Sequence, residues 1–147
     1  MAETETMTKS ERPIVPFLRL PEKPGEQAHL WGSKCKQCGA VYLGDRIACS
    51  RCLSTEPMDD IPLSDRGELH VFSIVHQSAP GIKTPYIAAI VDLPEGVSVR
   101  CNIEGVEPDP KNLKFGMPVE MFTENVHTDR EGVNIIAFKY RPVTNGQ

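Results

Sequence analysis

The chain has 147 residues and a formal net charge of −4 at pH 7, with 16 Lys and Arg against 20 Asp and Glu. This length is typical of a single domain with one main core, to which a small metal-binding lobe can be added. A net negative chain lacks the basic excess that binding to a phosphate backbone requires. The composition therefore disfavours nucleic acid as a partner.

No stretch of the sequence approaches the roughly 20 apolar residues of a membrane-spanning helix. Residues 1–12 are polar and of mixed charge, without the apolar core of a secretory signal. We therefore expect a soluble protein of the cytoplasm with no membrane partner. The cytoplasm is a compartment in which cysteines stay reduced.

Residues 1–12 show no apolar periodicity and are predicted to form a disordered lead. Residues 13–60 are predicted to form a proline-rich arm and a metal ribbon, and the prolines of the arm exclude a long helix. The arm nevertheless carries apolar side chains, namely Ile14, Val15, Phe17, Leu18 and Leu20. They are expected to dock either on the chain's own core or on a partner subunit. For the second case we assign Phe17, Leu18 and Leu20 as interface residues.

Four cysteines form two CxxC pairs, with Cys35 and Cys38 in the first and Cys49 and Cys52 in the second. Two such pairs across a short loop can present four thiolates to one tetrahedral metal. The alternative is a pair of disulfides, but a CxxC bridge closes a very small loop in a strained geometry. We therefore predict a metal site made of these four cysteines.

Four thiolates accept either zinc or iron. Zinc is favoured here because the ribbon leads into a longer β-rich segment, whereas a rubredoxin-type redox domain is expected to stand on its own. The four thiolates also leave no open coordination position, so the predicted Zn²⁺ is structural and adds folding energy without catalysing a reaction.

The cysteine region is locally basic, since Lys34, Lys36, Arg46 and Arg51 stand against Asp45 alone between residues 34 and 53. Ordinary solvation of a small metal lobe is one explanation of this patch. Contact with phosphate groups is the other.

From Arg66 onward the chain shows a period of two with turn signals, so residues 61–142 are predicted to form a β domain and residues 143–147 a tail. The predicted strands span 67–76, 86–93, 97–103, 117–126 and 132–140, and only 109–113 offers a helical turn. Five short strands punctuated by Gly and Pro predict a mostly β chain. The ribbon would be followed by a five-stranded OB-fold barrel, with an open sandwich as the alternative.

The sequence contains no nucleophile elbow, phosphate-binding loop or dinucleotide fingerprint, and we assign no catalytic residue. Cys101 lies in an alternating apolar run and is predicted to be a buried small hydrophobe. An OB fold can bind oligonucleotides, but acidic residues outnumber basic ones over 61–147. We therefore expect its aromatic residues to serve as core and interface anchors.

The order of these elements resembles a bacterial and archaeal family in which a rubredoxin-like zinc ribbon precedes an OB-fold domain. The resemblance covers about residues 13–142. It rests on Cys35-x-x-Cys38-Gly39, Cys49-x-x-Cys52, the strand from Gly67 to Ile74, Pro85-Tyr86, Leu93-Pro94-Glu95-Gly96 and Phe115-Gly116-Met117-Pro118-Val119. The chain departs from the family at its N-terminal part, where the proline-rich run replaces a short helix.

The resemblance implies a non-catalytic accessory subunit in a hetero-oligomer, which scaffolds a thiolase that cleaves 3-oxoacyl-CoA. Benzoylsuccinyl-CoA, from anaerobic degradation of aromatic hydrocarbons, is one candidate substrate. Lys34, Lys36, Arg46 and Arg51 would then contact CoA phosphates, and residues 78–84 would help to close the acyl pocket. Two alternatives stay open: a partner of an acyl-CoA hydratase or aldolase in steroid side-chain degradation, and a free nucleic-acid-binding module.

Overall fold

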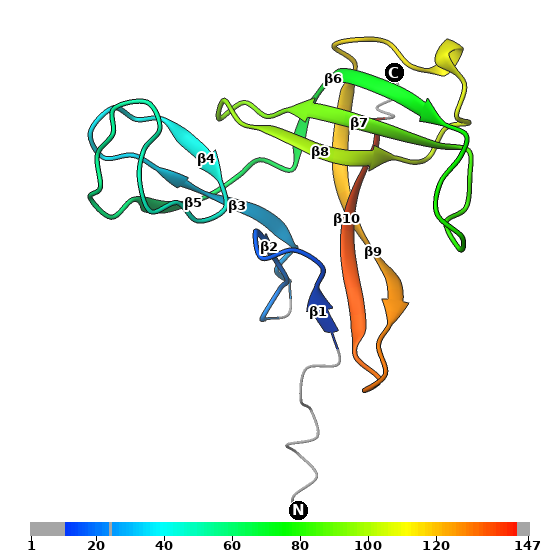
Figure 1. The fold of residues 1–147 in the computed structure, drawn as a ribbon, viewed down its shortest axis with the longest axis horizontal. Helices are drawn as coiled ribbons and strands as arrows, with labels where there is room; N and C mark the ends of the chain where they lie inside the picture. The colour runs from blue at the N-terminus through cyan, green and yellow to red at the C-terminus, as the bar shows by residue number, and fades with distance from the viewer. Residues whose placement is uncertain (1–10, 24, 144–147) are drawn as a thin grey trace, which may run out of the picture.

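The chain folds into two strand-rich lobes joined by an N-terminal arm (Figure 1). The computed structural model describes residues 11–23 and 25–143. The ribbon lobe and the barrel lobe share one continuous core, since Leu18, Leu30 and Leu63 belong to the same buried cluster as Leu69 and Val91. The two lobes therefore pack as one body.

The barrel is built from five strands and is closed. The strands are β6 (Arg66–Val75), β7 (Tyr86–Asp92), β8 (Ser98–Ile103), β9 (Pro118–Thr128) and β10 (Asn134–Pro142). They pair in the order β9, β6, β7, β8, β10, and β10 returns to pair with β9. The β10–β8 pair is parallel and the other pairs are antiparallel. This closure confirms the predicted OB-type barrel and not the open sandwich.

Alternating burial explains why these segments form the barrel. Along β7 the residues alternate between fully and partly buried, and β8 shows the same period. Register shifts between Leu69 and Val71 in β6, and between Ile135 and Ile136 in β10, mark bulges, which increase twist and help a sheet to close. The predicted helical turn is the 3₁₀ helix Pro110–Asn112, where the Asp109 side chain accepts a hydrogen bond from the backbone N–H of Lys111.

The ribbon lobe is a small antiparallel sheet around one central strand. Strand β3 (His29–Lys34) pairs with β2 (Leu18–Arg19), β4 (Val41–Leu43) and β5 (Asp59–Pro62). At Gly32 a Cβ would overlap the carbonyl oxygen of Tyr42, so this close pairing of β3 and β4 requires glycine. Strand β5 ends at Pro62, where the chain leaves the ribbon sheet.

The arm docks on the chain's own core. Strand β1 (Glu11–Pro13) pairs in parallel with β10, so Glu11 and Arg12 lie in a sheet and not in the predicted disordered lead. Leu18, assigned above to a partner interface, is only 1% exposed and belongs to the internal core. Phe17 packs edge-on against Phe138, with ring centroids 5.8 Å apart.

The arm thus supplies part of the core, the first of the two alternatives considered for its apolar side chains. Phe17 and Leu20 are partly buried against the same cluster. The remainder of the predicted lead, residues 1–10, and of the predicted tail, residues 144–147, lies outside the described residues. Within residues 11–23 and 25–143, no helix is long and apolar enough to cross a membrane.

Candidate metal centre and the surfaces around it

The two CxxC pairs form two turns with the same backbone hydrogen bonds. In the first turn, the N–H of Gly39 donates to the carbonyl of Cys35 over 3.0 Å. In the second turn, the N–H of Leu53 donates to the carbonyl of Cys49 over 2.9 Å. Strands β3 and β4 flank the first turn, and the second lies between β4 and β5. The ribbon sheet therefore brings the two turns together.

The four cysteine sulfurs converge on one point. The Sγ atoms of Cys35 and Cys52 are 3.6 Å apart, as are those of Cys38 and Cys49, and all four lie within 4.8 Å of one another. A tetrahedral zinc with Zn–S bonds of about 2.3 Å holds its sulfurs roughly 3.8 Å apart. A disulfide would require about 2.05 Å, so the sulfur positions fit a shared metal ion and not a bond between thiols.

Hydrogen bonds to sulfur favour the thiolate form at two of the four cysteines, Cys49 and Cys35. At Cys52 the backbone hydrogen bond from Ser54 lowers the pKa, but burial and the neighbouring sulfurs outweigh it and raise the pKa to about 12. The Tyr42 hydroxyl lies 3.2 Å from Cys49 Sγ, and the N–H groups of Cys52 and Arg51 donate to the same sulfur over 3.4 Å. The hydrogen bond with the Tyr42 hydroxyl is the main cause that lowers the pKa of Cys49 to about 6, because it stabilises the thiolate. Backbone N–H groups of Cys38 and Gln37 likewise lower the pKa of Cys35.

Tyr42 is a functional residue that the sequence analysis missed. Its hydroxyl also accepts a hydrogen bond from the Ser50 N–H at 3.1 Å, so it ties β4 to the second turn. The guanidinium of Arg46 stacks over its ring at 4.6 Å. No local motif marks such a contact, but a tyrosine near a CxxC pair is a usable signal, since metal-ligand sulfurs are commonly supported by hydrogen-bond donors.

The four basic residues predicted to contact phosphate all lie in the ribbon and are exposed. Lys36 faces Asp59, with 3.7 Å between Nζ and Oδ1, and Arg46 stacks on Tyr42. Arg51 lies inside the second CxxC pair, whereas Lys34 is the last residue of β3. The structure thus distributes the four charges over the ribbon.

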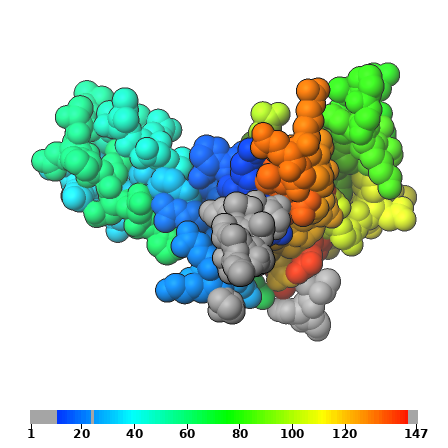
Figure 2. Space-filling view, turned by 90° about the horizontal axis from the view of Figure 1, so that it is seen from below, coloured from blue at the N-terminus to red at the C-terminus, as the bar shows by residue number. Residues whose placement is uncertain are grey.

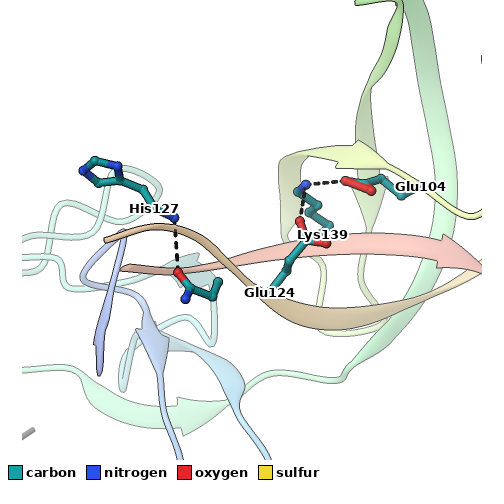
Figure 3. Close-up of polar contacts among 5 residues, drawn as sticks. Glu104, Glu124, His127 and Lys139 are labelled. Atoms are coloured by element: carbon teal, nitrogen blue, oxygen red, sulfur yellow. Dashed lines mark hydrogen bonds and ion pairs between the residues drawn. The ribbon is translucent and has the colours of Figure 1, made fainter. Parts of the chain in front are cut away.

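A second candidate surface is a pocket of about 530 Å³ on the barrel. Its lining includes Ile82 and Lys83 from the loop predicted to close an acyl pocket, together with Tyr86 and Lys139. Figure 3 shows Lys139 between Glu104 and Glu124. Lys139 Nζ bonds to both carboxylates, at 2.7 Å in the case of Glu124.

Lys139, Glu104 and Glu124 form a partly buried ion triad at the pocket wall. Burial lowers the pKa of Lys139, but hydrogen bonds to Glu104 and Glu124 outweigh it and raise the pKa overall. The ammonium therefore stays charged and holds β10 to the end of β8 and to β9. In Figure 3, His127 points away from this group, and its backbone N–H donates to the Asn125 side chain.

Cys101 is buried in the barrel core, as predicted, with 9% exposure. Burial raises the pKa of its thiol to about 12, which makes it a poor nucleophile. His70 lies 2.9 Å from an Asp92 carboxylate oxygen on the outer face of the barrel. Neither residue forms a nucleophile and base pair.

Known proteins resemble this chain in both lobes. Residues 23–57 match the family model of the rubredoxin-like zinc ribbon domain of ChsH2, and residues 60–124 match that of its C-terminal OB-fold domain. A DUF35 domain-containing scaffold protein of Methanothermobacter thermautotrophicus is 35% identical over 122 residues, which cover 81% of this chain and 90% of that protein.

Two further relatives are named for enzyme complexes. The benzoylsuccinyl-CoA thiolase subunit BbsA of Thauera aromatica is 32% identical over 148 residues, covering 97% of this chain and 100% of that protein. A solved structure described as the Ltp2-ChsH2(DUF35) aldolase has a TM-score of 0.59 and 25% identity, and covers 78% of this chain and 84% of that one. The chain therefore belongs to the DUF35 family of ChsH2-type proteins, in which a rubredoxin-like zinc ribbon precedes an OB-fold domain.

Proposed function

We propose that Cys35, Cys38, Cys49 and Cys52 bind one structural zinc ion. The sulfur separations of 3.6 Å support this assignment, as does the match of residues 23–57 to a zinc ribbon model. Four thiolates complete a tetrahedral shell, so the ion would fix the two turns and contribute folding energy. Elemental analysis should give one zinc per chain, and stoichiometric iron or a folded metal-free protein would contradict the assignment.

We further propose that the chain is a non-catalytic accessory subunit of an acyl-CoA thiolase complex. The observation that carries this proposal is the 32% identity to the thiolase subunit BbsA along 97% of this chain and all of that protein. The relatives named as scaffold proteins support a scaffolding role. The partner would supply the catalytic residues for cleavage of a 3-oxoacyl-CoA, with benzoylsuccinyl-CoA as the candidate substrate.

Two parts of the chain are proposed to serve that complex. The basic residues Lys34, Lys36, Arg46 and Arg51 would contact CoA phosphates, because arginine and lysine side chains bind phosphate oxygens through charge-assisted hydrogen bonds. The barrel loop with Ile82 and Lys83 would lie against the acyl site of the partner. The complex would operate in the cytoplasm, where thiols remain reduced.

An aldolase partner is the second candidate. It is favoured by the structural likeness to the Ltp2-ChsH2(DUF35) aldolase at a TM-score of 0.59 and 25% identity. The two candidates share the accessory role and differ in the catalytic subunit. Coexpression separates them, because only the proper catalytic subunit should copurify with this chain in a fixed ratio.

The decisive experiment expresses the chain with and without a candidate thiolase subunit, and assays CoA-dependent cleavage of a 3-oxoacyl-CoA. We expect the two proteins to copurify, and the activity or solubility of the thiolase to depend on this chain. An aldolase-type subunit is run in parallel. Full turnover by this chain alone, or an unchanged thiolase rate and solubility without it, would refute the accessory role.

A further inference from the structure

The two cysteine turns place a glycine and a leucine at equivalent positions. Gly39 and Leu53 each lie four residues after the first cysteine of their pair, and each N–H bonds to the carbonyl of that cysteine. Both residues adopt a left-handed backbone, with φ of +79° for Gly39 and +65° for Leu53. The turn therefore imposes the same conformation at both positions, and only one of them carries the residue suited to it.

Leu53 is the only residue other than glycine with positive φ in the described part of the chain. A left-handed backbone is unfavourable for leucine, because its Cβ crowds the following carbonyl oxygen. The side chain gains little from the core in return, since it is 78% exposed. Neither the backbone nor the packing of this chain accounts for a leucine at this position.

A second exposed apolar side chain precedes this turn in the sequence. Ile47, two residues before Cys49, is 91% exposed. We call Ile47 and Leu53 the knuckle patch. Arg46 and Arg51 adjoin it in the sequence and are exposed as well. Figure 2 shows the ribbon lobe, in cyan to green, projecting at one end of the molecule. The high exposure of Ile47 and Leu53 leaves both side chains accessible to a partner.

We infer that the knuckle patch docks into an apolar pocket of the catalytic subunit, beside the site where Arg46 and Arg51 would meet the CoA phosphates. This inference rests on the proposed function and names the surface through which it works. A second copy of this chain fits less well, because a symmetric contact through the patch would bring the arginines of the two copies together. Residues held in an unfavourable backbone conformation cluster at functional sites such as ligand clamps and switch regions.

The test uses the full zinc-loaded chain and the purified thiolase subunit of the coexpression experiment, with Kd measured by calorimetry. Leu53→Gly removes the side chain and relieves the backbone. We expect it to stabilise the ribbon against chelator-induced unfolding while raising Kd about tenfold, and Ile47→Ser to raise Kd by a similar factor. A purely structural leucine would not show opposite effects on stability and binding. Phe115→Ser, at a 73% exposed barrel position, is the matched control and should leave Kd within about twofold.

A Kd that stays within about twofold for both patch variants would overturn the inference while leaving the accessory role intact. An equal loss of affinity in Phe115→Ser would do the same, because the effect would then not be specific to the ribbon. Self-association of the wild-type chain that Leu53→Gly abolishes would assign the patch to a second copy. If the wild-type chain binds neither the thiolase nor the aldolase-type subunit, the proposed function itself fails and this inference falls with it.

Discussion

Replacement of Leu18 by alanine tests whether the arm belongs to this chain's core or to a partner. Leu18 is 1% exposed and lies in the cluster that joins the ribbon to the barrel. Truncation of a fully buried leucine costs about 3 kcal/mol, which combines the lost burial of the side chain with the cavity that remains. For a chain of this length, each kcal/mol lowers Tm by roughly 3 °C, so we expect a fall of about 9 °C.

The measurement is thermal unfolding of the isolated zinc-loaded chain, followed by circular dichroism. Ile14→Ala is the control, because Ile14 lies on the same arm and is 51% exposed. Its cost should stay below about 1 kcal/mol, as for most surface substitutions. The opposite result would be a Tm for Leu18→Ala within about 2 °C of wild type, similar to the shift of the control, together with weaker binding to the catalytic subunit. In that case the arm docks on the partner, and the assignment of Leu18 to this chain's core is refuted.

Four further outcomes are expected. Cys49→Ser should abolish stoichiometric zinc binding and unfold the ribbon more than the barrel, which hydrogen exchange can resolve; protection lost equally in both lobes would contradict this. Tyr42→Phe should weaken zinc binding about tenfold at pH 7. In the variant, the pKa of Cys49 should rise from about 6 toward its usual range. The difference in zinc affinity should therefore shrink above pH 9, where the Cys49 thiol is ionised in both proteins. Chelator competition measures this affinity, with Tyr86→Phe as control. The hydrogen bonds that raise the pKa of Lys139 contribute stability that is present below its ordinary value of 10.5 and is lost as pH rises through the raised value. Lys139→Met should therefore unfold more readily than wild type at pH 8, and a gap that widens at alkaline pH would contradict the sign. Short single-stranded oligonucleotides should show no salt-dependent binding to the chain in fluorescence anisotropy. A sub-micromolar affinity would instead support a nucleic-acid-binding module.

The barrel could be predicted from the sequence because its strands are regular and locally marked. The five predicted strands agree with β6 to β10 to within a few residues at each end. Alternation of apolar side chains defines each strand, and turn residues such as Gly96 define where it stops. The cysteine spacing was equally informative, since it predicted a cluster that the structure brings together within 4.8 Å.

The features that could not be predicted from the sequence depend on contacts between segments that are distant along the chain. The parallel pairing of Glu11 with Asn134 in β1 and β10 leaves no local pattern, so the start of the arm resembles a free lead. The Lys139 triad joins residues from three different strands or strand ends for the same reason. The apolar residues of the arm were recognised, but whether they face this chain or another could be decided only once the core was known.

The two cysteine turns of this chain hold more information together than either turn alone, because Gly39 and Leu53 share one backbone conformation. A single CxxC turn predicts only that a left-handed position follows it, where glycine is favoured. Two turns in one chain add a reference, because the same backbone is built once with glycine and once with leucine. A leucine kept at 78% exposure against its own backbone preference is a conflict between local and global structure, and such conflicts concentrate at functional positions. Equivalent positions in paired metal turns are therefore a place to look for partner contacts in other ribbons.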